Sequence, residues 1–365
     1  MVEHASLSAA VVAPRPAFLA QLRRRFFRTP FETAISLAGA AFLAWLAWSL
    51  FGWGVLRAVW TSPDGTAAVC RGSEGACWAV IHVRWRLIMF GLFPFDEQWR
   101  STLACLVIVL TGVASCVPFF WRPLRLAPLW LAGFGIFYLL MHGGVFGWRV
   151  VSPADWGGLT LTAFVYAGVV LLGMPLAICL ALLRQSRLPL VSGTTAVIID
   201  TVRSLPLISV LFTAALILPF VLPSYLVGDK IWRIILGYAL FFAVYQAEIL
   251  RSGITFLHAG QQEAAKALGL NYWQRTTRII LPQAFRRALP PTINQLVISF
   301  KDTSLIVIIG FFDILASGNA AFGAGEWSFA WVEVYCFVAL IYFVFVFSLS
   351  RYGVYLERRV RVGKY

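Results

Sequence analysis

Charged residues are scarce in this chain of 365 residues. Only 13% of its residues are Asp, Glu, Lys or Arg, whereas 60% are apolar. About a quarter of the residues of a typical soluble domain are charged, so this composition excludes an ordinary soluble globular protein. The mean hydropathy of +0.80 agrees with this exclusion. The chain therefore belongs in a lipid bilayer.

The sequence also lacks the motifs of several enzyme classes. No Gly-x-x-x-x-Gly-Lys-Ser/Thr segment occurs, so the chain cannot be a P-loop ATPase by itself. Its four histidines are scattered, and no cysteine or histidine cluster has the spacing of metal ligands. No nucleophile–base pair is evident either, which disfavours an intramembrane enzyme. We expect a non-catalytic chain that binds no metal and no cofactor of its own.

Acidic residues are few, with 16 Asp and Glu against 30 Lys and Arg, and the resulting net charge of +14 invites a nucleic-acid interpretation. On an arrangement of eight membrane helices with a cytoplasmic N-terminus, nineteen basic residues fall in cytoplasmic segments and eight in external ones. This asymmetry is what the positive-inside rule predicts. The basic excess therefore reflects membrane topology, with both termini cytoplasmic, and we expect no nucleic-acid partner.

Long apolar runs are abundant. A membrane-spanning helix needs about 20 mostly apolar residues, and eight runs qualify: 34–56, 101–121, 126–145, 159–183, 195–222, 231–254, 291–315 and 329–349. Arg23, Arg24 and Arg25 precede the first run, but its apolar part is long and no clean cleavage site follows, so we expect a retained helix rather than a signal peptide. The sequence thus predicts an all-α, polytopic membrane protein.

Polar breaks divide the chain unevenly. We expect a cytoplasmic N-terminal segment (1–33), three membrane helices with a long external loop at 57–100 (34–157), a five-helix core (158–350) and a basic cytoplasmic tail (351–365). Cys70 and Cys77 lie in the external loop, where an oxidising compartment permits a disulfide. Their spacing allows that bond without requiring it. The other four cysteines lie in apolar helices as small hydrophobic residues.

A polar stretch interrupts the apolar core between residues 259 and 286. From Gln261 to Leu268 every residue is a good helix former, Glu263 is expected in the first turn, and Gly269 is placed for a left-handed C-cap. Asn271 is expected to cap a second helix, with Gln274 in the reciprocal capping position. This second helix should run through Ile280 and end where Pro282 interferes. The pattern predicts a helix, a tight turn and another helix.

The segment Glu263-Ala264-Ala265-Lys266-Ala267-Leu268-Gly269, closed by Ile280-Leu281-Pro282, resembles the EAA loop in the membrane subunits of bacterial ABC importers. Flanking segments resemble the polar amino acid permeases, namely Ala247-Glu248-Ile249-Leu250-Arg251-Ser252-Gly253-Ile254, Leu281-Pro282-Gln283-Ala284 and Lys301-Asp302-Thr303-Ser304-Leu305. The long external loop and the extra N-terminal helices are most similar to the M-type permease of general L-amino acid importers.

The resemblance implies a channel-forming subunit that imports L-amino acids across the bacterial inner membrane. Its implied partners are separate ABC ATPase subunits that bind ATP and Mg, a second permease subunit, a periplasmic amino-acid-binding protein, and membrane lipid. For the second permease we favour a homologous chain that forms a heterodimer, and a homodimer is the alternative. Glu263, Ala264, Ala265, Gly269, Leu281 and Pro282 would form the contact that couples the ATPase to transport. The alternative for this loop is an ordinary capped helical hairpin.

Charged residues inside membrane helices are expensive, and they face a cavity or a partner. Glu248 and Arg251 lie three apart on one helix face, as do Asp200 and Arg203, so each pair could be an internal ion pair or could line the translocation path. Lys301, Asp302, Thr303 and Ser304 interrupt another apolar run. There we favour a break that lines a gate or a path over simple helix–helix pairing.

One other class of transporter stays open at this point. An ion-gradient-driven secondary amino acid transporter would need no ATPase, and internal inverted repeats would favour it. No second copy of the Ala-Glu-Ile-Leu-Arg or Lys-Asp-Thr-Ser segments occurs in the sequence.

Overall fold

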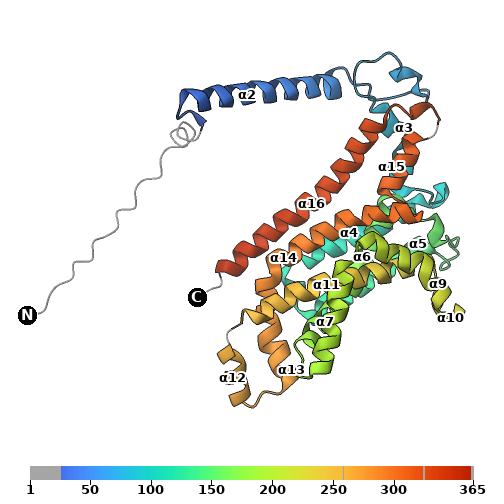
Figure 1. Ribbon diagram of the computed structural model, residues 1–365. Helices are drawn as coiled ribbons and strands as arrows, with labels where there is room; N and C mark the ends of the chain where they lie inside the picture. The colour runs from blue at the N-terminus through green and yellow to red at the C-terminus, as the bar shows by residue number, and fades with distance from the viewer. Residues whose placement is uncertain (1–25, 258, 324, 363–365) are drawn as a thin grey trace, which may run out of the picture. The chain divides into compact units, whose positions relative to one another are not determined.

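A computed structural model describes residues 26–257, 259–323 and 325–362 (Figure 1). The predicted N-terminal segment 1–33 therefore lies mostly outside the described residues, as do residues 363–365 of the predicted tail. Packing divides the described chain into two units, one made of the residues up to 60 together with 69–78 and the other of residues 61–68 and those from 79 onward. The predicted functional division, with a core at 158–350, stays a prediction.

The first unit contains α2 (Pro30–Phe51), which continues into a π-helical turn at Gly52–Leu56. Thr29 and Glu32 begin α2 with a reciprocal capping box, and Pro30 occupies the first helical position, where a missing N–H costs nothing. No side chain of α2 is buried. A disulfide joins Cys70 to Cys77, with their Cα atoms 5.8 Å apart, so the bond that the sequence permitted is present.

The second unit is built from helices of very different lengths. In chain order they are α3 (Ala79–Phe90), α4 (Gln98–Ser115), α5 (Pro123–His142), α6 (Gly158–Arg184), α7 (Pro189–Ser204), α8 (Leu207–Phe212), α9 (Leu218–Val221), α10 (Ser224–Val227), α11 (Lys230–Thr255), α12 (Ala259–Ala267), α13 (Tyr272–Arg275), α14 (Leu281–Asp302), α15 (Ile314–Gly323) and α16 (Trp331–Val362). A two-residue strand, β1 (Phe312–Asp313), bridges Gly157 and Gly158. Part of the predicted external loop at 57–100 is therefore helical.

Helices α6 and α11 form the centre of the second unit and pack along each other (Figure 1). A Cβ atom at Gly173 of α6 would lie 2.6 Å from the Phe242 ring of α11, so only glycine permits this approach. Around them, Phe137, Trp156 and Phe164 form an aromatic core with α5. A second cluster, rich in alanine, joins α6 and α11 to α7 and α14. Small residues at such interfaces let helices approach closely.

Seven helical segments of the described chain are long and apolar enough to cross a membrane, or eight if one bent pair is a single span. The bent pair corresponds to the predicted span 195–222, and the prediction of one continuous helix there is wrong. α7 and the segment Leu207–Val221 meet at 104°. Leu205 precedes Pro206 and adopts an extended conformation, because the proline ring disfavours a helical residue before it.

The predicted span 291–315 is also displaced. The helical segment runs from Tyr272 to Ile309, because a π turn at Thr276–Ile280 leads directly into α14. Pro282 therefore does not end the helix as predicted. It occupies the first turn of α14, and local π adjustment is one of the ways by which membrane helices tolerate proline. At the C-terminus, α16 extends to Val362, so the predicted tail from 351 begins inside a helix.

Candidate functional site

The polar stretch after α11 forms the predicted helix, turn and helix. α12 ends in a Schellman arrangement, in which the N–H of Gly269 donates to the carbonyl of Lys266 (2.9 Å) and the N–H of Leu270 donates to that of Ala265 (3.2 Å). Gly269 has φ of +72°, a left-handed conformation that strains other residues. The turn is therefore set by the glycine.

The second helix of this stretch begins with a complete capping box at Asn271. The N–H of Gln274 donates to Asn271 Oδ1 (2.9 Å), and the N–H of Asn271 donates to Gln274 Oε1 (3.0 Å). This confirms the predicted cap. α13 itself is one turn long, and the π turn carries the chain on to α14. The helix pair is thus joined to a membrane span without a flexible connection.

The site residues of this loop differ in exposure. Glu263 and Ala264 are exposed, as is Gly269, whereas Ala265 is only 2% exposed and packs within the chain. Glu263 lies in the second turn of α12, not in the first as predicted, because the helix begins at Ala259. Leu281 and Pro282 begin α14. The predicted contact residues therefore divide into an exposed set and the inward-facing Ala265.

Four charged residues are linked at the end of α6. Arg184 donates to both carboxylate oxygens of Asp200 on α7 (3.1 and 3.4 Å) and lies 3.7 Å from Glu248 on α11. Arg251 bonds Glu248 one turn along α11, as the sequence predicted. The predicted pair of Asp200 with Arg203 is wrong, because Asp200 faces Arg184. Sequence analysis missed Arg184, since nothing along the chain connects it with residues 16 and 64 positions away.

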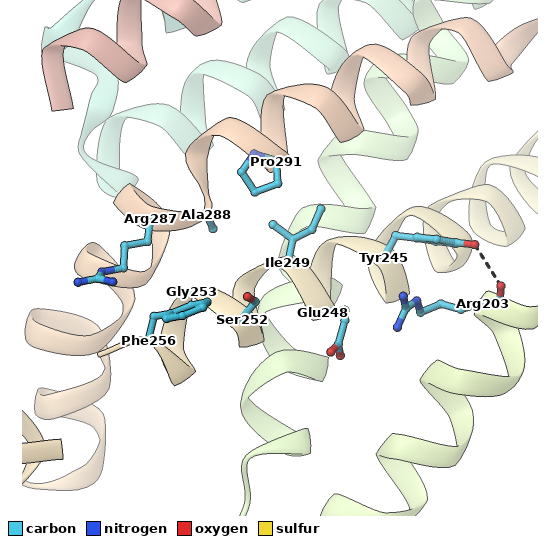
Figure 2. A pocket seen from close by; sticks show the side chains of 10 residues that line it. All are labelled: Arg203, Tyr245, Glu248, Ile249, Ser252, Gly253, Phe256, Arg287, Ala288 and Pro291. Carbon is cyan, nitrogen blue, oxygen red and sulfur yellow. Dashed lines mark hydrogen bonds between the residues drawn. The ribbon is translucent and has the colours of Figure 1, made fainter. Parts of the chain in front are cut away.

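Arg203 faces a different neighbour. Its guanidinium lies over the Tyr245 ring, 5.3 Å from the ring centroid, and its Nε atom is buried without a hydrogen bond in the described chain. The Tyr245 hydroxyl donates to the Arg203 carbonyl at 3.1 Å (dashed in Figure 2). Arg203 therefore holds the end of α7 against α11.

A cavity of about 320 Å³ lies between α7, α11 and α14 (Figure 2), lined by Arg203, Tyr245, Glu248, Ile249, Ser252, Gly253, Phe256, Arg287, Ala288 and Pro291. Two of the predicted path candidates, Arg203 and Glu248, thus share one cavity. Glu248 Oε2 accepts no hydrogen bond within the described chain, although Arg184 lies near it. The lining of the cavity therefore combines the Glu248 carboxylate with two guanidinium groups and several apolar side chains.

The remaining path candidates lie farther along α14. The α-helix ends at Asp302 and continues as a 3₁₀ helix over Thr303–Ile309. Thr303 donates to the carbonyl of Phe300 (2.7 Å) and Ser304 to that of Lys301 (2.9 Å), so both hydroxyls bond local backbone. Lys301 is ten residues beyond Pro291, which is about 15 Å along a helix. The structure therefore does not place Lys301–Ser304 in the cavity of Figure 2.

Asp313 is an ionisable residue that sequence analysis did not select. Its side chain is fully buried at the start of α15, where Oδ1 accepts the N–H of Ala316 (2.9 Å) and Oδ2 has no partner in the described chain. Burial raises the pKa of this carboxyl to about 7, against the opposing effect of the backbone hydrogen bonds. The described residues contain no group of His, Cys, Asp and Glu that could hold a metal ion.

The region that contains these sites matches a known protein family. Residues 173–362 match the family model described as "Binding-protein-dependent transport system inner membrane component". The matched segment contains the α12–α13 loop, the linked charges and the cavity. It begins within α6 and therefore excludes α2 to α5.

Similar proteins extend the match to the N-terminal helices. The chain is 39% identical, over 88% of its own length and 88% of the other, to the inner membrane amino-acid ABC transporter permease protein YhdY of Escherichia coli strain K12. It is 34% identical, over 96% and 97% of the two chains, to the glutamate/glutamine/aspartate/asparagine transport system permease protein BztC of Rhodobacter capsulatus. A solved structure, "Crystal structure of an amino acid ABC transporter with histidines", aligns with 55% of this chain and 92% of its own, at 26% identity and a TM-score of 0.48.

Proposed function

Because the chain belongs to the family of binding-protein-dependent transport system inner membrane components, we propose that it is the channel-forming permease subunit of an ATP-binding-cassette importer that carries L-amino acids across the bacterial inner membrane. The similar proteins of Escherichia coli and Rhodobacter capsulatus, which are named as amino acid permeases, support this substrate class. In this proposal the chain itself forms part of the translocation path for the amino acid. ATP and Mg bind to a partner ATPase.

The exposed face of the α12–α13 loop carries this proposal. Glu263 and Ala264 leave one side of α12 open, and Gly269 sets a fixed angle between the two helices. A capped pair joined directly to a span can transmit a push, because the Schellman turn and the Asn271 capping box hold the two helices together and no flexible linker separates α13 from α14. Ala265 packs behind the contact and α14 carries the motion into the membrane.

The charges at the end of α11 supply a site for a passing substrate. An amino acid is a zwitterion, and the residues that line the cavity include Glu248 for the ammonium and Arg203 or Arg287 for the carboxylate. Arg184 and Arg251 hold Glu248 in place from α6 and from α11 itself. We assign Lys301–Ser304 to a gate farther along α14, where the helix changes its winding.

An external binding protein delivers the substrate in this scheme, and a second, related permease completes the path. ATP binding closes two ATPase subunits below the loops and moves each coupling pair. Both termini of this chain lie in the cytoplasm. The ion-gradient-driven alternative needs no ATPase and leaves the exposed α12–α13 loop without a role.

Substitution of Gly269 tests the proposal. We expect Gly269→Asp to leave the chain in the membrane, in complex with the ATPase, but to uncouple ATP hydrolysis from amino acid uptake. No described atom lies within 4 Å of a Cβ built at Gly269, so a side chain there meets solvent or a partner rather than this chain. The measurements are co-purification of the ATPase with the tagged chain, its stimulated hydrolysis, and uptake into vesicles.

Gly269→Asn is the matched control, because asparagine adopts the left-handed conformation more readily than most residues. If the added negative charge alone disrupts the contact, Gly269→Asn couples normally; if the partner approaches closely, both variants uncouple. Normal uptake with normal ATPase stimulation by Gly269→Asp contradicts the assignment of this loop. A tagged chain that never brings an ATPase with it contradicts the importer itself.

A further inference from the structure

A second, larger cavity borders the α12–α13 loop. It has a volume of about 740 Å³ and is enclosed by the end of α6 and the residues that follow it, by α12, by α13 and by the π turn. Its lining is Pro175, Ile178, Cys179, Leu182, Leu183, Gln185, Ser186, Arg187, Gln262, Lys266, Tyr272, Trp273, Arg275, Thr276 and Ile280. None of these residues lines the cavity between α7, α11 and α14.

The charge of this lining has one sign. Arg187, Lys266 and Arg275 contribute three cations, and no lining residue is acidic. Within the part of the chain that the structure describes, the side chains of these three residues form neither an ion pair nor a hydrogen bond. Three unpaired cations around one cavity repel each other, so an anion that enters it gains all three attractions.

The part of the lining that α6 contributes is mostly apolar. Pro175, Ile178 and Leu182 lie along the last turns of α6 and face the same cavity, together with Ile280. The first three belong to α6, which is long and apolar enough to span a membrane, and Ile280 belongs to the candidate span Tyr272–Ile309. Trp273 and Tyr272 stand at the polar side and are 66% and 51% exposed. Tryptophan and tyrosine beside a basic group are typical of the headgroup level of a bilayer.

We propose that this cavity binds an anionic membrane phospholipid, with its phosphate between Arg187, Lys266 and Arg275 and the start of an acyl chain along α6. Basic pockets between helices on the cytoplasmic side of membrane proteins bind such headgroups. The inference rests on the proposed function in one respect, the placement of the α12–α13 loop at the cytoplasmic membrane surface. A zwitterionic amino acid does not match this cavity, since no carboxylate is present for its ammonium.

The site gives the lipid a mechanical role. Its phosphate would join Arg187, which follows α6, to Lys266 on α12 and Arg275 on α13. The coupling pair would then be held against a membrane helix from the lipid side while its exposed face remains free for the ATPase. An anionic bilayer would thereby stiffen the joint through which the ATPase acts.

The test is native mass spectrometry of the detergent-purified complex after incubation with phosphatidylglycerol, with phosphatidylcholine or with inorganic phosphate. We expect the complex to retain phosphatidylglycerol in preference to phosphatidylcholine. Arg187→Gln and Arg275→Gln should each weaken that retention by about fivefold, since one basic residue near an anionic headgroup contributes about that factor. Arg187→Lys should restore most of it. Arg278→Gln, an exposed residue of the same turn outside the cavity, should change nothing.

Equal retention of phosphatidylglycerol by wild type, Arg187→Gln and Arg275→Gln would overturn the proposal. So would equal retention of the two lipids, or displacement of phosphatidylglycerol by inorganic phosphate, which would identify a free-anion site. If the two variants lose the ATPase but keep the lipid, the cavity is part of the ATPase contact instead. A wild-type chain that binds phosphatidylglycerol but no ATPase would overturn the importer and leave the lipid site standing.

Discussion

Two acidic residues of this chain differ in the groups that surround their carboxylates. Glu248 and Asp313 are both acidic groups in a largely apolar chain, yet two arginines hold the first and no cation in the described chain pairs with the second. The Glu248–Arg251 contact was predictable, because the two residues are one helical turn apart. Asp313 was not, since its burial depends on the packing of α15 near β1 and α6.

Asp313 should make the stability of the protein depend on pH. Its pKa in the folded chain is about 7, against 3.8 when unfolded, so the folded state retains a proton that the unfolded state releases. Stability should therefore fall as pH rises from about 4 to about 7 and change little above that range. Thermal unfolding of the purified protein in detergent between pH 4.5 and 8.5 measures this.

Asparagine cannot ionise, so Asp313→Asn should flatten that profile above pH 5. The exposed Asp229, at the start of α11, offers the matched control, and Asp229→Asn should leave the slope unchanged. An Asp313→Asn profile that follows the wild type at every pH would show that another group is responsible.

At the scale of elements, residues close in sequence determined where helices begin and end, whereas long-range contacts determined how neighbouring helices meet. Asn271, Gln274 and Gly269 carry their own capping chemistry, so the loop could be predicted in detail. The bend between α7 and α8 was missed although Leu205–Pro206 signalled it. Pro282 was expected to end a helix, but the helix continues through it, because the π turn before it leads directly into α14.

The joint of α6, α7 and α11 depends on Arg184. Replacing it with glutamine leaves Asp200 without its partner and Glu248 with Arg251 alone, so Arg184→Gln should destabilise the protein by about 1–3 kcal/mol. A larger loss is not expected, because about a fifth of the Arg184 and Glu248 side chains is exposed. Thermal unfolding and uptake together check this.

A double-mutant cycle separates the contact between Arg184 and Glu248 from a general effect of removing a charge. Arg184→Gln combined with Glu248→Gln should cost less than the sum of the two single changes, because the pair is then removed whole. Strict additivity would mean that the two residues act independently.

At the scale of the whole molecule, the apolar runs located most of the membrane spans, but the predicted spans 195–222 and 291–315 needed correction. Successive loops at the two ends of α11 provide a test of the proposed orientation. Tyr225, 81% exposed in α10, lies before α11, and Leu268, 78% exposed, lies after it. If α11 crosses the membrane, these two residues lie on opposite sides.

We expect an impermeant thiol reagent to label Tyr225→Cys but not Leu268→Cys in intact spheroplasts, in a chain whose four free cysteines are replaced by serine. Both variants should react after the membrane is opened, which controls for accessibility. Labelling of Leu268→Cys alone would reverse the orientation and place the α12–α13 loop outside, away from any cytoplasmic ATPase.

The sequence by itself determined the class of this protein, most of its membrane runs, the capped helix pair and the family resemblance. These follow from composition and from contacts within one or two helical turns, which a linear pattern records. Only the tertiary structure decided that Asp200 pairs with Arg184, that Ala265 faces inward, and that Arg187, Lys266 and Arg275 surround one cavity. Those arrangements join residues far apart along the chain, and their partners are chosen by how α6, α7, α11 and the loop pack together.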